Sequence, residues 1–344
     1  MKVDCEHPLG KSGEKMAGRK RRRKRKRSSF RFPFMLMICA VLVGHLVARF
    51  SYQYTYTLSL LDREAGIDLS EIEVDEENLT SKNEITNILL VGADKRESWK
   101  QAGRSDSVMI LTIDQVHKQL KLTSIMRDLY IPIPEHGNNR FNAAYSYGGI
   151  SLLYQTIAQN FGIKMDGYVI VDFEAFKDVI DTLEGIEIEL TEAEYKYLTT
   201  AYAKTKGSVK NVKPGRNILN GEQALAYTRI RQDITADFGR TQRQRTVLQS
   251  IFTKAKSMSV GQLLELAKEI LPSITTDLND EEITSYIMSV LVMGAGEFEQ
   301  FRIPVDYSFE NKTISGMKVL VPNMEKNVQA LQDFIFMGTE KIEE

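Results

Sequence analysis

Two aspartates and an arginine follow or precede three apolar runs in a way that could place them together. Asp94 ends the run ITNILLVGAD, Asp106 lies at the start of the run SDSVMILTID, and Arg127 directly follows KQLKLTSIM. If these runs are sequential antiparallel strands, all three side chains meet at one edge of the sheet. Arg96 and Arg104 lie in the segment between the first two runs and join that edge. The sequence therefore gathers two carboxylates and three guanidinium groups.

A second group of cationic residues lies in YTRIRQDITADFGRTQRQR, residues 227–245. It holds five of the 12 arginines that follow residue 50, in a part of the chain with 19 lysines. Arg229 and Arg231 are two positions apart, so on an extended segment they share a face. Helical spacing of i, i+3 and i+4 places three further polar residues on one helix face: Arg240, Arg243 and Gln244.

Together these residue types indicate an anion site. Close carboxylates repel one another unless a cation or a shared proton lies between them. Mg²⁺ commonly binds through one or two carboxylates plus substrate phosphates, and arginine binds phosphate with a bidentate fork. We therefore expect a di- or polyphosphate site, with Asp94 and Asp106 holding Mg²⁺ or another hard divalent cation such as Mn²⁺.

Simpler interpretations stay open at this point. An aspartate at a strand end often belongs to a turn, and an arginine-rich helix start can be a solvated surface with Asp233 and Asp237 as salt-bridge partners. Other chemistries fit poorly. His117 and His136 are the two histidines of the body, which argues against a histidine zinc site or a Ser-His-Asp triad. The sequence contains no GxxxxGK[ST] phosphate loop.

The elements that must position these residues form an α/β fold, with a mixed central sheet flanked by helices. Residues 195–217 are a polar, lysine-rich insertion, and Asn220 is a predicted helix cap. Beyond the three strands above, further strands are predicted at 167–173, 185–190 and 298–305. Helices are predicted at 151–161, 174–183, 221–227, 240–257, 259–271 and 279–293.

The N-terminal part predicts a membrane anchor. Residues 1–31 have a net charge of +10 and the remainder −11, and nine basic residues in a row, Arg19–Arg27, precede 17 residues without a charge, Phe32–Ala48. That length is at the short end for a bilayer span. The positive-inside rule puts the basic tail in the cytoplasm and the body outside the cell. A cleaved signal peptide and a nucleic-acid-binding tail are the alternatives.

These observations divide the chain into five regions. Both cysteines, Cys5 and Cys39, lie in the tail or the predicted span, so no intrachain disulfide can stabilise the body. The regions are a cytoplasmic basic tail (1–31), a transmembrane signal-anchor helix (32–50), a juxtamembrane stalk (51–84), an extracellular catalytic core (85–258), and C-terminal helices and a strand that complete the same domain (259–344).

The blocks NILLVGADKR, GRSDSVMILTID, LTSIMRDLYIPI, RFNAAYSYGG, GYVIVDFEAFKDVIDTLEGIEI, LNGEQALAYTRIR and DFGRTQRQR occur in this order. Over residues 85–257 the chain resembles the LytR-CpsA-Psr family. Met126 departs from the pattern, because many members have proline there. The short cytoplasmic tail and single anchor helix are also similar to those of the family.

The resemblance implies a phosphotransferase on the surface of a Gram-positive cell. It would transfer a glycopolymer, such as wall teichoic acid or capsular polysaccharide, from a polyprenyl-pyrophosphate carrier to peptidoglycan and form a phosphodiester. Asp94 and Asp106 would hold the metal, and with Arg127 they would be the catalytic residues. The phosphate-binding residues implied by the resemblance are Arg104, Arg127, Arg229, Arg231, Arg240 and Gln244.

Two other functions remain open. A pyrophosphatase or phosphodiesterase that releases the same carrier to water would need nearly the same residues. A membrane-anchored transcriptional regulator would use the basic tail to bind DNA, although a body outside the cell leaves only that tail for the purpose. We expect membrane lipid, the lipid-linked glycopolymer and peptidoglycan as partners, and no nucleic acid.

Overall fold

The computed structural model describes most of the chain. It covers residues 31–61, 63, 69, 72–74, 79–93, 105–202, 209–231 and 236–338, without the side chains of 31–42, 201 and 236. The chain divides into two compact units, Met1–Phe50 and Ser51–Glu344. Helix α1 is Arg31–Leu58 and includes the predicted helix at 32–50. Within the part of the chain that is described, no helix combines the length and apolar character of a membrane span.

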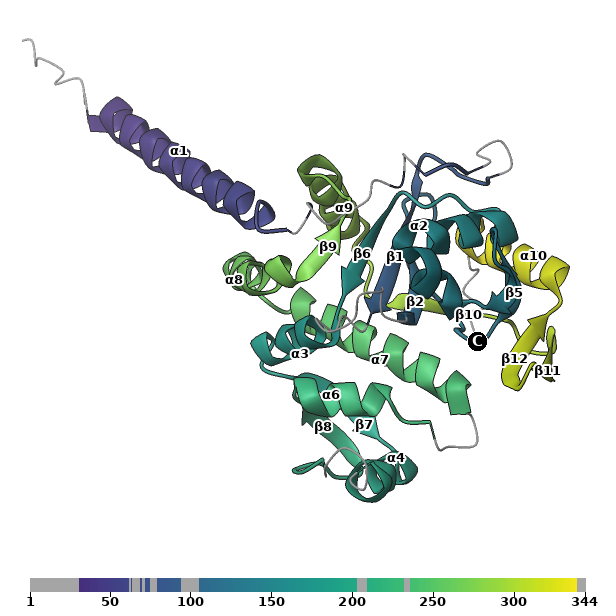
Figure 1. Cartoon of the computed structure of the whole chain (residues 1–344). Helices are drawn as coiled ribbons and strands as arrows, with labels where there is room; N and C mark the ends of the chain where they lie inside the picture. Colours follow the sequence, from purple (N-terminus) through teal and green to yellow (C-terminus); the bar gives the residue numbers. More distant parts are fainter. Residues whose placement is uncertain are drawn as a thin grey trace, which may run out of the picture. The chain divides into compact units, whose positions relative to one another are not determined.

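The main sheet of the second unit has six strands in the order β10-β3-β2-β1-β6-β9 (Figure 1). The first three strands along the chain pair antiparallel, as predicted, whereas β1 with β6 and β3 with β10 are parallel pairs. The predicted mixed sheet is therefore confirmed. Its strands are β1 (Ile85–Ala93), β2 (Ser105–Asp114), β3 (Gln119–Ile125), β6 (Gly167–Val171), β9 (Ile274–Thr276) and β10 (Phe298–Ile303).

Helices cover both faces of this sheet. Alternate strand residues point to opposite faces, and apolar residues on each face pack against helices. Leu89 lies in a core formed with α2 (Asn142–Phe161) and α10 (Met324–Phe336). Its neighbour Ile88 lies in another core, which includes residues of α7 (Ala236–Lys256) and α9 (Asp280–Met293). Figure 1 shows α2 and α10 together beside the sheet. The result is the predicted arrangement of a sheet flanked by helices.

A smaller two-stranded sheet has a core of its own. Strands β7 (Ile186–Leu190) and β8 (Gly215–Leu219) pair antiparallel, and α7 packs on β7. Asn220 caps the next helix through a reciprocal capping box with Gln223, which confirms the predicted cap. Besides α7, the helical elements of this core are α3 (Phe173–Thr182), the π-helical turn η3 (Tyr197–Ala201), α6 (Gly221–Thr228) and α8 (Val260–Ile270), and α4 (Glu192–Lys196) connects β7 to η3. The 195–217 segment thus contributes secondary structure rather than only an insertion.

Several elements differ from the prediction. The segment at 136–149 contains strand β5 (Gly137–Arg140), paired with β4 (Tyr130–Ile133), and the first turns of α2. Gly148 and Gly149 interrupt the helical backbone angles inside α2, so the helical period in the sequence begins only after them. The structure also contains a hairpin that was not predicted, formed by β11 (Phe309–Ile314) and β12 (Met317–Pro322), and a short η4 turn at Leu271–Ser273.

Candidate active site

A β-bulge places Asp106 at the edge of the main sheet. Gly92 pairs with Ser107, but the next residue of β1, Ala93, pairs with Ser105, so Asp106 is the extra residue on β2. A bulge redirects side chains and often lies beside a functional site. The two strands approach closely here, since a Cβ at Gly92 would lie only 3.2 Å from the Cβ of Ser107.

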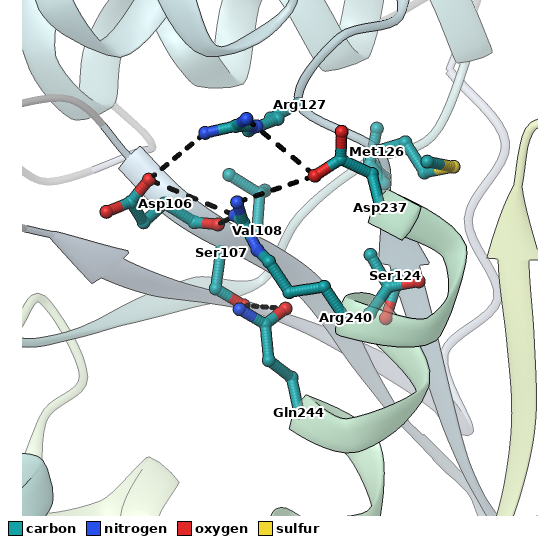
Figure 2. A pocket seen from close by; sticks show the side chains of 11 residues that line it. Asp106, Ser107, Val108, Ser124, Met126, Arg127, Asp237, Arg240 and Gln244 are labelled. Atoms are coloured by element: carbon teal, nitrogen blue, oxygen red, sulfur yellow. Dashed lines mark hydrogen bonds and ion pairs between the residues drawn. The ribbon is translucent and has the colours of Figure 1, made fainter. Parts of the chain in front are cut away.

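The first turns of α7 lie against this edge (Figure 2). Arg240 is only 4% exposed, and its Nη2 donates to the backbone carbonyl of Asp106. One turn later, Gln244 Oε1 accepts a hydrogen bond of 3.3 Å from Ser107 Oγ. Arg127 follows β3 and completes the group from the third strand. Two consecutive strands and a helix far from them in the sequence thus supply one set of polar side chains.

Four charged groups alternate in a ring at the centre of the site (Figure 2). Arg127 lies 3.6 Å from Asp106 and 3.7 Å from Asp237, while Arg240 lies 3.9 Å from Asp106 and 3.8 Å from Asp237. These nitrogen–oxygen distances are too long for hydrogen bonds. Asp237 Oδ1 and Arg240 Nη1 are buried, and neither has a hydrogen-bond partner within the described residues. Buried polar atoms normally have partners, so the ring is suited to a further ligand.

The electrostatics of the ring favour an anion. Burial, followed by the charges of Arg127 and Arg231, lowers the pKa of Arg240 to about 10, although Asp106 and Asp237 act in the opposite direction. Arg240 therefore stays charged at neutral pH, but in a position where its charge is poorly solvated. An anionic group at the ring would relieve the repulsion among the three arginines.

The space within the group is small. A cavity of about 10 Å³ is lined by residues of β2, β3 and α7, among them Ser124, Thr241 and Gln244. That volume corresponds to about one water molecule. A phosphate group is larger, so its binding requires Arg127 or another side chain of the ring to move.

The carboxylates fit a hard cation only together with a phosphate ligand. Among the residues that the structure describes, no group of three or more His, Cys, Asp and Glu side chains could hold a metal alone. Asp106 and Asp237 nevertheless present carboxylates to one cavity. Mg²⁺ is commonly held by one or two carboxylates and the oxygens of a bound phosphate. The residues present therefore fit Mg²⁺ that binds jointly with a phosphorylated substrate.

The structure brings four of the predicted site residues together at one cavity: Asp106, Arg127, Arg240 and Gln244. Their roles stay predictions. Arg231 is exposed, yet close enough to lower the pKa of Arg240. Three residues lie outside the described part of the chain, so the structure places none of them: Asp94, Arg96 and Arg104.

The predicted extended face shared by Arg229 and Arg231 is wrong. Arg229 is the C-cap residue of α6, because the helix that begins at the Asn220 cap continues through Thr228. Its guanidinium lies 4.4 Å from the ring centre of Phe173, a cation–π contact, and Arg229 does not line the cavity.

The predicted face shared by Arg240 and Arg243 is also wrong. Arg243 turns to the smaller core, where its Nε lies 2.7 Å from Glu194 Oε1. Arg245 takes a third direction and donates to Ser124 Oγ at 2.9 Å. Both guanidinium groups are buried, so each needs oxygen partners that compensate its buried charge.

Sequence reasoning gave Asp237 only the role of a local salt-bridge partner. In the structure its carboxylate belongs to the charged ring. The sequence does contain a signal for this role. Asp237 precedes Arg240 by three residues, so the two side chains lie on the same side of α7. Ser107 was missed altogether, since only the strand register shows that it faces Gln244.

Two curated relatives cover much of the chain. The regulatory protein MsrR of Staphylococcus aureus is 32% identical over 253 residues, which are 72% of this chain and 74% of MsrR. The polyisoprenyl-teichoic acid–peptidoglycan teichoic acid transferase TagU of Bacillus mycoides is 33% identical over 206 residues, 59% of this chain and 64% of TagU.

Solved structures of TagT from Bacillus subtilis share the fold. TagT bound to LI-WTA aligns with a TM-score of 0.59 and 25% identity, over 80% of this chain and 98% of TagT. TagT with bound octaprenyl pyrophosphate lipid aligns over the same fractions with a TM-score of 0.56 and 24% identity, which supports the fold alone.

The match to a family model is wider than the resemblance seen in the sequence blocks. Residues 54–333 match the model of the LytR_cpsA_psr family, so the match includes α9, the β11–β12 hairpin and most of α10. The fold, the relatives and this match agree with one another, and the chain belongs to the LytR-CpsA-Psr family.

Proposed function

We propose that the protein is a membrane-anchored phosphotransferase. It transfers a glycopolymer, of the wall teichoic acid or capsular polysaccharide class, from a polyprenyl-pyrophosphate carrier to peptidoglycan. The observation that carries this proposal is the ring of Arg127, Asp106, Arg240 and Asp237, whose ion pairs are too long for hydrogen bonds. The names of two relatives support it, because TagU is a teichoic acid transferase and TagT is bound to LI-WTA.

In the proposed reaction, the guanidinium groups of Arg127 and Arg240 bind the pyrophosphate oxygens, and Arg231 adds positive potential from the exposed side. The hydrogen bond from Ser107 orients the amide of Gln244 toward the same group. An acceptor hydroxyl attacks the phosphorus next to the glycopolymer. The new oxygen–phosphorus bond forms as the bond to the bridging oxygen breaks, polyprenyl phosphate leaves, and the hydroxyl proton passes to a carboxylate and then to water.

Asp106 and, by the family resemblance, Asp94 would hold Mg²⁺ or Mn²⁺. When bound, the cation neutralises phosphate charge and reduces repulsion between the substrate and the carboxylates. The need for a cation follows from the ring itself, since a pyrophosphate beside Asp106 and Asp237 would otherwise meet two like charges.

The proposed topology puts the site near its lipid substrate. The uncharged run at Phe32–Ala48 spans the cell membrane once, the basic tail stays in the cytoplasm and attracts anionic lipid, and the body is extracellular. A donor that is itself anchored in the bilayer then reaches the site without leaving the membrane.

The test uses the purified full-length protein with a polyprenyl-pyrophosphate-linked saccharide and peptidoglycan fragments. We expect Arg127→Ala and Arg240→Ala to lower the transfer rate by about 10²–10³-fold, because each removes a charge that stabilises the transition state. Arg216→Ala is the matched control, since this arginine lies on β8 with 79% of its side chain exposed. Transfer by both site variants at the control rate would contradict the proposal.

The same assay without peptidoglycan separates transfer from hydrolysis. A transferase consumes the donor slowly until the acceptor is added. Consumption at the full rate with water alone would instead favour the pyrophosphatase or phosphodiesterase alternative.

A regulatory role is the second candidate, because the relative MsrR is named a regulatory protein. If regulation is independent of transfer, cells that carry Arg127→Ala will keep the transcript profile of the wild type, whereas cells that lack the gene will not. If regulation is a consequence of transfer, both strains will change alike.

A further inference from the structure

A second, larger groove adjoins the charged ring. We call it the hairpin groove, because Asn311, Lys312 and Thr313 of β11 and Lys318 of β12 line it. Its volume is about 450 Å³, within the range of ligand pockets. Asp237 lines both the groove and the small cavity of the ring, as does Met126. A molecule in the hairpin groove therefore reaches the site of phosphate binding.

The lining of the hairpin groove has the mixed character that sugars require. Hydroxyl, amide and ammonium groups come from the exposed positions of the hairpin, while Phe238, Val319 and Leu320 supply apolar surface. A polyprenyl chain would meet too many polar groups here. A polyphosphate would meet too little cationic charge, since Lys312 Nζ already lies 2.7 Å from Glu310.

The charges within the groove distinguish between the transferred glycopolymer and the peptidoglycan strand that accepts it. Asp128 and Asp237 lie among its lining residues and offset the charges of Lys312 and Lys318, so the lining has no net positive charge that would attract a polymer with its own phosphates. A neutral sugar hydroxyl, in contrast, can donate a hydrogen bond to a carboxylate. The buried Oδ1 of Asp237 has no hydrogen-bond partner in the described structure, so it can accept one.

We infer that the hairpin groove binds the acceptor glycan strand, with the attacked hydroxyl directed past Asp237 to the ring. Lys318 is placed to bind a carboxylate of the peptide that such a strand carries. This inference rests on the proposed function, because it identifies which of the two substrates occupies this side of the site.

The test measures binding and kinetics with the full-length protein. We expect the double variant Asn311→Ala/Lys318→Ala to raise the KM for a soluble peptidoglycan fragment by about tenfold, with the KM for the lipid-linked donor unchanged. Lys326→Ala is the control, since this lysine is exposed on α10 and does not line the groove. A raised donor KM with an unchanged acceptor KM would overturn the inference, and so would unchanged values for both.

A direct binding measurement keeps the inference distinct from the proposed function. Calorimetry with the same peptidoglycan fragment, without donor, should show binding by the wild type and the control and about tenfold weaker binding by the double variant. Binding in the groove without any transfer would refute the transferase but not the groove. If the wild type transfers the polymer but all variants bind the fragment with the same affinity, the assignment of the acceptor to the groove is refuted and the transferase is not.

Discussion

Arg240 carries the least solvated charge of the ring. Its guanidinium is buried, donates to the carbonyl of Asp106 and lies near Arg127, another cation. Arginine tolerates such a place because its ordinary pKa is high enough to stay charged after a large decrease. A lysine at the same position would have a pKa closer to neutral pH, because its ordinary pKa is lower.

Arg240→Lys should therefore make the activity sensitive to alkaline pH. The surroundings lower the pKa of Arg240 from its ordinary value to about 10. A similar decrease would bring a lysine from its ordinary value of about 10.4 to about 8. As the pH rises through that value the lysine loses its proton, and phosphate binding weakens. The transfer rate of the variant should fall between about pH 7 and 9 while the wild-type rate does not, and parallel pH–rate profiles would contradict this account.

At the scale of elements, a buried ion pair holds α10 against the main sheet. Lys121 Nζ lies 2.6 Å from Asp114 Oδ2 and donates to the carbonyls of Ile335 and Met337 at 3.0 and 2.8 Å. Both charged side chains are fully buried. The lysine thus satisfies the last carbonyls of α10 and complements the negative end of its dipole.

Removing one partner of this pair should be costly. Lys121→Met leaves Asp114 buried without its cation and should lower the free energy of unfolding by about 3–5 kcal/mol, measured by urea denaturation. Lys326→Met, at an exposed position of α10, is the control. A loss below about 1 kcal/mol would show that the pair contributes little. The double variant Asp114→Asn/Lys121→Met should recover part of the loss, because the uncompensated charge is gone.

The same pair predicts how stability depends on acid. Burial raises the pKa of Asp114, but hydrogen bonds from Lys121 and His117 outweigh it, and the pKa is lowered overall. Because the folded state holds the proton less tightly, this carboxylate stabilises the fold above its unfolded pKa of about 3.9, and the contribution is lost as the pH falls through the folded value. Asp114→Asn should be less stable at neutral pH, and its melting temperature should fall less steeply below about pH 4.

The elements also show what the sequence could predict. The first three strands are apolar runs with polar turns, so their existence and antiparallel order follow from the pattern. The β11–β12 hairpin was missed because the four inner residues of β11 are exposed and polar, so this strand lacks apolar alternation, although its partner β12 contains the buried Val319 and Leu320. The bulge at Asp106 was missed because register depends on the partner strand, not on the strand alone.

At the scale of the whole molecule, the candidate site lies within one compact unit. Ser51–Glu344 includes the main sheet, the smaller sheet, the charged ring and the hairpin groove. Convergence of Asp106 and Arg127 was predictable, because the β2–β3 hairpin brings them to one edge. The place of α7 was not predictable, since the 110 residues from 126 to 235, which include a second core, separate it from β3.

We expect the body to fold without the N-terminal unit. A chain that begins at Ser51 should have a melting temperature within a few degrees of the full chain, because the cores lie in the second unit. It should also appear in the soluble fraction of cells, whereas the full chain should sediment with membranes. Circular dichroism and cell fractionation measure the two outcomes. A truncated chain that still sediments with membranes would contradict the proposed anchor.

Helix α7 has polar contacts in three directions. Arg240 and Gln244 face the charged ring, Arg243 pairs with Glu194 in the smaller core, and Arg245 reaches Ser124 of β3. Each added residue turns an α-helix by about 100°. One residue inserted between Arg240 and Arg243 would therefore rotate Arg243, Gln244 and Arg245 by about 100° relative to Arg240, so the two residues that face the ring would no longer do so together. The length of this helix turn should vary much less among functional relatives than the identity of its exposed side chains.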